Sequence, residues 1–142
     1  AASAASAYAG IPLTHRNISA SCAFITGHRA GDWTTKEETI RLMKAADTVA
    51  VYMGVKNIAE IQDMIIRSGK DQNTPVAFIE WATTEEQRTV TTTVKEMAKS
   101  AKENCISNPC MIIIGEVVRF HDQLNWFEKQ MSNIDFTTGV SL

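Results

Sequence analysis

The sequence lacks any long apolar run and has few cysteine and proline residues. It contains three Cys and three Pro among 142 residues. No stretch approaches the roughly 18 consecutive apolar residues that a membrane-spanning helix needs, so we expect no membrane partner. Three cysteines cannot all pair within one chain, and no other feature indicates secretion, so we expect reduced thiols and a cytoplasmic protein.

Metal-binding motifs and the common catalytic motifs are also missing. No Cys-x-x-Cys or His-x-x-x-His spacing indicates zinc, so we expect no metal. There is no Gly-x-Ser-x-Gly nucleophile motif, no phosphate-binding loop and no glycine-rich dinucleotide fingerprint. The formal charge is −2, from 14 Lys and Arg against 16 Asp and Glu, which argues against a bulk attraction to nucleic acid. Spacing alone therefore predicts no reaction.

A hydrophobic content of 44% indicates one globular domain with a buried core. Strand-like and helix-like patterns alternate along the chain. Strands are predicted over residues 21–27, 48–54, 76–80, 88–94 and 109–118, and helices over 1–9, 31–47, 57–69, 95–105 and 121–130. This alternation predicts an α/β fold: a layered, mixed sheet of about five strands flanked by helices.

Some details of these elements can be predicted as well. Thr34 or Thr35 is a plausible N-cap for the second helix, because acidic residues follow in its first turn. The Thr-rich segment 88–94 should be an antiparallel neighbour of the strand before it. In the last helix, Leu124, Trp126 and Phe127 should pack inward. We expect a domain over residues 1–128 and a C-terminal tail over residues 129–142.

Ligands in an open α/β sheet bind beyond the carboxyl ends of strands. Four predicted strand ends carry glycine or other small residues, at positions 26–28, 52–54, 80–84 and from 115 onward. Such residues let a ligand or another backbone approach closely. These four segments are therefore the candidate positions of a site.

A Gly-x-Pro turn at residues 10–12 comes shortly before His15 and Arg16. The turn fixes the backbone, so the polar side chains after it are held at a defined location. Arg16 can be an anion-binding residue, or a surface residue or helix cap. His15 and His28 can be solvated or hydrogen-bonded turn residues, and Met53 can fill the core. The residues alone leave these alternatives open.

Five segments, taken in order and at their separations, resemble one known family. They are AYAGIPLTHR, TGH, YMG, TPVAFIEWATTEEQR and IIIGEVV. Together they resemble the C-terminal half of the uroporphyrinogen-III C-methyltransferases, a branch of the S-adenosylmethionine-dependent tetrapyrrole methylases. The resemblance covers about residues 1–128, and its most specific parts are GIPLTHR and the E-x-A-T-T-x-E-Q-R run.

The resemblance implies a two-domain enzyme, usually a homodimer, with its active site in a cleft between two α/β domains. The resemblance further implies that S-adenosylmethionine is the cofactor and that uroporphyrinogen III is methylated on two ring carbons to give precorrin-2. The N-terminal domain of the family, with its glycine-rich cofactor loop, is absent from this sequence. We expect the catalytic base to lie in that domain, so the catalytic residues are unknown and the isolated chain should have little activity.

The resemblance also implies which residues contact the ligands. The residues expected to contact the cofactor are Ala1, Met53, Ala82 and Cys110. Arg16, His28 and Met53 would face the tetrapyrrole, whose carboxylates suit an arginine fork and a histidine donor at the cleft mouth. Trp81 stands where the family commonly has a smaller or polar residue, and it would cover the adenine or pack on a neighbour.

Two other readings stay open at this point. The chain can belong to a different methylase of the same superfamily, acting on a later corrin precursor or on a protein or RNA target. It can also be a non-catalytic α/β module for dimerisation or small-molecule binding. A basic surface and a divergent GIPLTHR segment would favour another target, and neither is seen.

Overall fold

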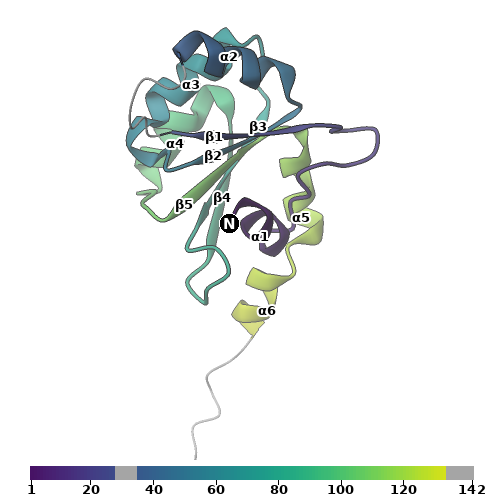
Figure 1. The fold of residues 1–142 in the computed structure, drawn as a ribbon. Coiled ribbons are helices and arrows are strands. Elements are labelled where there is room, and N and C mark those ends of the chain that lie inside the picture. The colour runs from purple at the N-terminus through teal and green to yellow at the C-terminus, as the bar shows by residue number, and fades with distance from the viewer. Residues whose placement is uncertain (28–34, 134–142) are drawn as a thin grey trace, which may run out of the picture.

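The structure is a computed structural model that describes residues 1–27 and 35–133 (Figure 1). Its elements are α1 (Ala2–Tyr8), β1 (Cys22–Thr26), α2 (Lys36–Ala45), β2 (Thr48–Tyr52), η1 (Val55–Asn57), α3 (Ile58–Arg67), β3 (Pro75–Glu80), β4 (Arg88–Thr93), η2 (Val94–Glu96), α4 (Met97–Glu103), β5 (Cys110–Ile114), η3 (Glu116–Phe120), α5 (His121–Leu124) and α6 (Phe127–Asn133). Each predicted strand is present. Among the described residues, no helix is long and apolar enough to cross a membrane. The expected domain boundary at residue 128 falls within α6.

The five strands form one mixed sheet in the order β1-β2-β5-β3-β4. β1 and β2 are parallel, whereas β5 runs antiparallel to both of its neighbours, β2 and β3. β4 is antiparallel to β3, which confirms the prediction for the Thr-rich segment. The carboxyl ends of β1, β2 and β3 therefore meet at one edge of the sheet, together with the amino end of β5.

The direction of β5 corrects one prediction about the site. The segment from Gly115 onward was expected to join the other strand ends, and this is wrong because β5 runs in the opposite direction. Gly115 N donates to the carbonyl oxygen of Pro75 at 3.0 Å, at the start of β3. The end of β5 therefore lies at the far edge of the sheet, and its beginning, Cys110, lies at the edge where the other strands end.

Helices cover both faces of the sheet, so the chain forms three layers. Figure 1 shows α2, α3 and α4 on one side and α1 and α5 on the other. Large side chains such as Phe78 and Ile112 pack beneath α2, α3 and α4. The opposite face carries the small residues Ala50 and Ala77, on which the alanine-rich α1 packs. The central strands are buried on both faces, which explains their nearly unbroken apolar sequence.

The start of α2 shows why this helix begins where it does. Thr35 Oγ1 accepts a hydrogen bond from Glu38 N at 3.1 Å, and Glu38 Oε2 accepts one from Thr35 N at 2.7 Å. This reciprocal capping box satisfies two backbone donors that the helix cannot pair internally. It selects Thr35 rather than Thr34 as the N-cap. The hydrogen bond that Thr35 N donates to the Glu38 carboxylate is the main cause of a lowered pKa of Glu38.

The C-terminal segment differs from its prediction. The sequence predicts one helix over 121–130, but the structure has two short helices, α5 and α6, with a break between them. Leu124 and Trp126 are 49% and 47% exposed, so the expectation that both pack inward is wrong. The break turns Trp126 along the outside of α1, where its indole N–H donates to Ala7 O at 3.2 Å and its ring lies 5.2 Å from that of Tyr8.

Two glycines with positive φ provide a matched test of this arrangement. Gly10 has φ +68°, and a Cβ on it would lie 2.2 Å from the backbone oxygen of Leu124. Gly69 has φ +87° and nothing within 4 Å of such a Cβ. We expect Gly69→Ala to lower the free energy of unfolding by about 1–2 kcal/mol, the cost of a left-handed alanine. Gly10→Ala should cost clearly more, because backbone atoms cannot rotate away from the new methyl group.

Urea unfolding followed by circular dichroism measures both free energies. Equal losses in the two variants would show that the backbone of the α5–α6 junction does not press on the turn at Gly10.

Candidate functional site

A pocket of about 610 Å³ lies at the edge of the sheet where β2 and β3 end and β5 begins. Its volume is within the range of small-molecule sites, ~300–1,000 Å³. The lining residues come from the start of α1, from the ends of β2 and β3, and from the turn before β5. They are Ala1, Ala4, Ala5, Tyr52, Met53, Ile79, Trp81, Ala82, Thr83, Thr84, Asn108, Pro109, Cys110 and Met111.

The pocket brings together all four residues that the sequence suggested for the cofactor, Ala1, Met53, Ala82 and Cys110. They are far apart in the chain, and the strand order places them side by side. Met53 follows β2, Ala82 follows β3, and Cys110 begins β5 between those two strands. Of the residues suggested for the substrate, only Met53 lines this pocket, and His28 lies outside the described residues.

The backbone of the pocket is unusual, because three of its non-glycine residues have positive φ. Met53, Trp81 and Thr83 have φ of 51°, 48° and 71°. They are three of the five such residues in the described part of the chain. This region is unfavourable for L-residues, and most unfavourable for a β-branched one such as Thr83. Strained backbone of this kind clusters at functional sites, where the surrounding structure must hold it in place.

Hydrogen bonds hold these strained loops. Trp81 N donates to Pro109 O at 3.0 Å and so joins the loop after β3 to the turn before β5. Thr83 N donates to Oε1 of the buried Gln87 at 2.8 Å. The side-chain Nε2 of Gln87 donates in turn to Oε1 of Glu128 on α6 at 3.0 Å. The C-terminal helix therefore supports the loop that carries Trp81 and Thr83.

Sequence reasoning assigned no role to Gln87 or Tyr52. Gln87 belongs to the E-x-A-T-T-x-E-Q-R run, so a signal was present, but its task of closing the loop is visible only in the structure. The Tyr52 hydroxyl accepts a hydrogen bond from Ala2 N at 3.1 Å, which fixes the start of α1 over the pocket. Gly27 packs directly against the backbone of Gly54, because a Cβ on Gly27 would lie 2.4 Å from the Cα of Gly54.

The side chains that line the pocket carry no charge. Burial raises the pKa of the Cys110 thiol to about 12, and the neighbouring Glu80 carboxylate adds to the shift. Cys110 is therefore a neutral thiol at physiological pH and a poor nucleophile. Across residues 1–27 and 35–133, no group of three or more His, Cys, Asp or Glu could hold a metal ion. The pocket suits an uncharged, partly aromatic ligand group better than a polyanion.

Arg16 lies elsewhere. It is exposed and lines a separate concavity that shares no lining residue with the pocket. Its loop is closed by a hydrogen bond from His15 N to Ser19 O at 2.8 Å, and Ala20 N donates to Asp47 Oδ2 at 2.9 Å. That bond lowers the pKa of Asp47, which stands just before β2. The structure therefore places Arg16 at the edge of the sheet where β2 starts, not at the opposite edge, where β2 ends and Met53 follows it.

Comparison with known proteins identifies the family. Residues 1–98 match the family model of the tetrapyrrole (corrin/porphyrin) methylases. The chain is 40% identical over 137 residues to the uroporphyrinogen-III C-methyltransferase of Bacillus subtilis, covering 96% of this chain and 53% of that protein. It is 49% identical over 120 residues to the protein of the same name from Priestia megaterium, covering 82% of this chain and 49% of that protein. The chain belongs to the tetrapyrrole methylase family.

Solved structures agree with this assignment. A uroporphyrin-III C-methyltransferase from Thermus thermophilus, solved in complex with S-adenosylhomocysteine, superposes with a TM-score of 0.68 and 32% identity. The match covers 79% of this chain and 49% of that one. The expected α/β fold with a mixed sheet is thus confirmed. The chain spans about half the length of the curated relatives described above.

Two of the three thiols, those of Cys105 and Cys110, should differ sharply in reactivity. Cys105 is exposed, whereas Cys110 is buried with its pKa raised to about 12. We expect N-ethylmaleimide at neutral pH to label Cys105 first and to leave Cys110 unmodified in the folded protein, because little thiolate forms at Cys110. Tandem mass spectrometry distinguishes the two cysteines. Labelling in urea is the control, and there both should react. Equal rates in the folded protein would contradict the buried, neutral state of Cys110.

Proposed function

We propose that this pocket binds S-adenosylmethionine and that the chain is the C-terminal half of a uroporphyrinogen-III C-methyltransferase. The observation that carries the proposal is the pocket itself: uncharged, built on strained loops at strand ends, and lined by all four residues suggested for the cofactor. The chain's membership of the tetrapyrrole methylases supports it. So does the 32% identical relative that was solved with S-adenosylhomocysteine.

The residues present fit the adenosyl part of this cofactor. Ala1 and Ala82 leave apolar walls without bulky side chains, and the indole of Trp81 is 48% exposed beside them. An aromatic base can pack against such surfaces. The polar side chains of Thr83 and Asn108 supply hydrogen-bonding groups at the rim. A few polar groups in an otherwise apolar cavity are typical of small-molecule sites.

The pocket does not suit the tetrapyrrole itself. Uroporphyrinogen III carries several carboxylates, which need arginine or lysine partners, and none of the side chains that line the pocket is cationic. We therefore assign the pocket to the cofactor and expect the substrate to approach from outside it. Of the predicted substrate residues, Met53 lines the pocket and is 59% exposed. Its side chain can therefore contact the cofactor inside the pocket and the tetrapyrrole outside it.

S-adenosylmethionine, when bound, would supply the methyl group that converts uroporphyrinogen III to precorrin-2 in two transfers. The residues of this chain would contribute by holding the cofactor in a fixed orientation, which accounts for much of the rate of a two-substrate reaction. No lining residue is an Asp, Glu, His or Lys, so removal of a proton needs a group from outside the pocket. That fits the expectation that the base belongs to another domain.

We also propose that the complete protein is a homodimer. Phe24 on the edge strand β1 is 55% exposed, and its ring lies 6.4 Å from that of Tyr52. An exposed aromatic side chain on the edge strand of a sheet favours association with another surface. Sedimentation velocity of the full-length protein tests the oligomeric state, and a monomer would refute this part of the proposal.

Filling the pocket should weaken cofactor binding. Ala82→Phe places a ring inside it, whereas Ala45→Phe makes the same change at an exposed position at the end of α2. In the full-length protein, we expect Ala82→Phe to raise the Kd for S-adenosylhomocysteine by about tenfold or more, the scale on which pocket shape discriminates ligands. Ala45→Phe should leave the Kd unchanged. Isothermal titration calorimetry measures both, with thermal melts to verify folding.

Absence of binding to the folded wild-type protein would refute the cofactor assignment. Equal affinity of wild type and Ala82→Phe would place the cofactor elsewhere.

The separate location of Arg16 gives another prediction. Arg16→Ala should leave the affinity for S-adenosylhomocysteine unchanged, because Arg16 lies in a separate concavity that has no lining residue in common with the pocket. If its guanidinium meets a substrate carboxylate in the assembled enzyme, the KM for uroporphyrinogen III rises while the cofactor Kd does not move. An unchanged KM would contradict the proposed role of Arg16 in substrate binding.

A further inference from the structure

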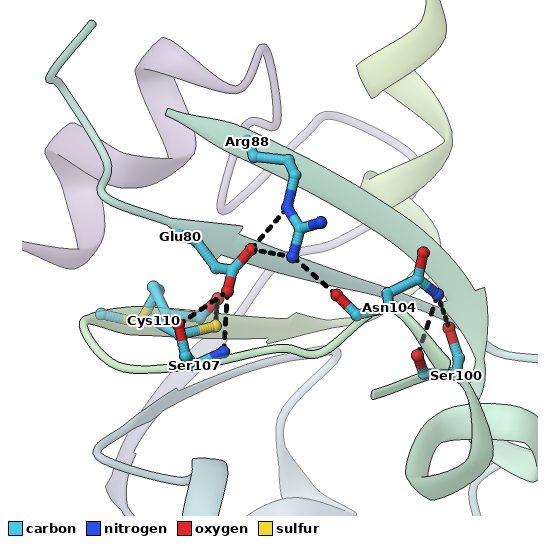
Figure 2. Close-up of polar contacts among 7 residues, drawn as sticks. Glu80, Arg88, Ser100, Asn104, Ser107 and Cys110 are labelled. Atoms are coloured by element: carbon cyan, nitrogen blue, oxygen red, sulfur yellow. Dashed lines mark hydrogen bonds and ion pairs between the residues drawn. The ribbon is translucent and has the colours of Figure 1, made fainter. Parts of the chain in front are cut away.

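A buried carboxylate stands directly behind the pocket. Glu80 is the last residue of β3 and only 4% exposed, yet it is not among the residues that line the pocket. Carboxylates are seldom so buried unless charged or polar partners surround them. Figure 2 shows that the Glu80 side chain meets groups from β4 and from the turn before β5. A buried charge between three segments requires an explanation in terms of what it holds together.

The first partner of Glu80 is Arg88, which lies opposite it in the β3–β4 ladder. Arg88 Nε donates to Glu80 Oε2 at 2.6 Å, and the second guanidinium nitrogen approaches the same oxygen at 2.5 Å. That nitrogen also donates to Asn104 O at 2.8 Å, at the end of α4. The guanidinium therefore joins the end of β3 to the C-terminus of α4, where a cation is also favoured by the helix dipole.

The second partner of Glu80 is the backbone of Ser107. Ser107 N donates to Glu80 Oε1 at 2.7 Å, and the Ser107 hydroxyl lies 3.3 Å from the same oxygen. Ser107 immediately precedes Asn108 and Pro109, which form one wall of the pocket. The two carboxylate oxygens thus have different tasks, because Oε2 faces Arg88 and Oε1 holds the turn before β5 (Figure 2).

The opposite wall also begins at Glu80. The next residue, Trp81, lines the pocket and donates its backbone N–H to Pro109 O at 3.0 Å. The positions of Glu80 and Cys110 are paired in the β3–β5 ladder. The loop after β3 and the turn before β5 are therefore connected twice, once through the backbone at Trp81 and once through the Glu80 carboxylate.

We propose that Glu80 is a positioning residue for the cofactor pocket: its carboxylate, neutralised by Arg88, sets the spacing of the two walls at residues 81–84 and 107–110. This inference rests on the proposed function, since it assigns Glu80 a role at that same pocket. Glu80 does not touch the ligand. Its effect reaches the pocket through Ser107 and Trp81, and a side chain of another length or charge would let these walls separate.

Two substitutions break the arrangement in different ways. Glu80→Gln keeps the length but removes the charge that pairs with Arg88, and it places an amide where one carboxylate oxygen accepts hydrogen bonds. Glu80→Asp keeps the charge but is shorter by one methylene, so it cannot reach Arg88 and Ser107 N together. If one of the two variants fails to fold, the other still tests the proposal, because the two changes disturb the site in different ways.

The chain offers a matched control for loss of a carboxylate–arginine pair. Arg119 Nε donates to Glu116 Oε2 at 2.6 Å, the same distance as in the Glu80 pair. This control pair is exposed and lies after β5, away from the pocket. Glu116→Gln therefore makes the same chemical change without touching either wall.

The experiment measures two quantities on the full-length protein and its variants. Hydrogen–deuterium exchange without ligand reports the backbone amides of the two walls, residues 81–84 and 107–110, with α2 as an internal reference. Calorimetry reports the Kd for S-adenosylhomocysteine. We expect faster exchange in both segments for each Glu80 variant and a Kd about tenfold higher, the scale on which residues that orient a binding group act. Glu116→Gln should change neither quantity.

The other outcomes overturn one proposal or the other. Unchanged exchange in the two segments, or equally faster exchange in α2, would show that Glu80 does not hold the walls specifically. Faster exchange with an unchanged Kd would show that the spacing of the walls does not govern cofactor affinity. If the folded wild type binds no S-adenosylhomocysteine, the proposed function fails, and the exchange result alone decides whether Glu80 holds the two walls.

Discussion

The structure depends on the antiparallel insertion of β5 between β2 and β3. This placement brings the amino end of β5 to the carboxyl ends of its two neighbours, so that Cys110 meets the residues that follow them. It also places Glu80 opposite Cys110, where the carboxylate can reach the turn before β5. Ligands in open α/β sheets usually lie beyond the carboxyl ends of strands. The pocket follows this rule at β2 and β3, but its third strand, β5, contributes its amino end.

The sequence identified the strands well and predicted the antiparallel direction of β4, but it left the direction of β5 undetermined. Alternating helical and strand-like patterns predicted every strand, and the capping pattern at Thr35 was readable. The run CMIII is buried on both faces, so no alternation of polar and apolar residues reveals its direction or its neighbours. Direction is set by pairing with segments distant in the chain. For that reason the end of β5 at Gly115 was assigned to the wrong edge.

The candidate site was only partly predictable. The four pocket residues suggested for the cofactor came from family resemblance, and their shared location came from the sheet order. The left-handed conformation of Thr83 could not be foreseen, since a β-branched residue gives no local signal for positive φ. The burial of Glu80 was equally hidden, because a carboxylate at a strand end is usually solvated. Its partner Arg88 lies across a hairpin whose length and register had to be known first.

The contacts of α1 bear on the order in which the chain assembles. α1 packs on the sheet and is also held from outside by the C-terminal segment. Nδ1 of the buried His121 donates to Ala9 O at 2.6 Å, and the rings of Phe127 and Tyr8 lie 4.9 Å apart. During synthesis α1 leaves the ribosome before α5 and α6 do. The contacts that hold α1 from outside can therefore form only after α5 and α6 have been made.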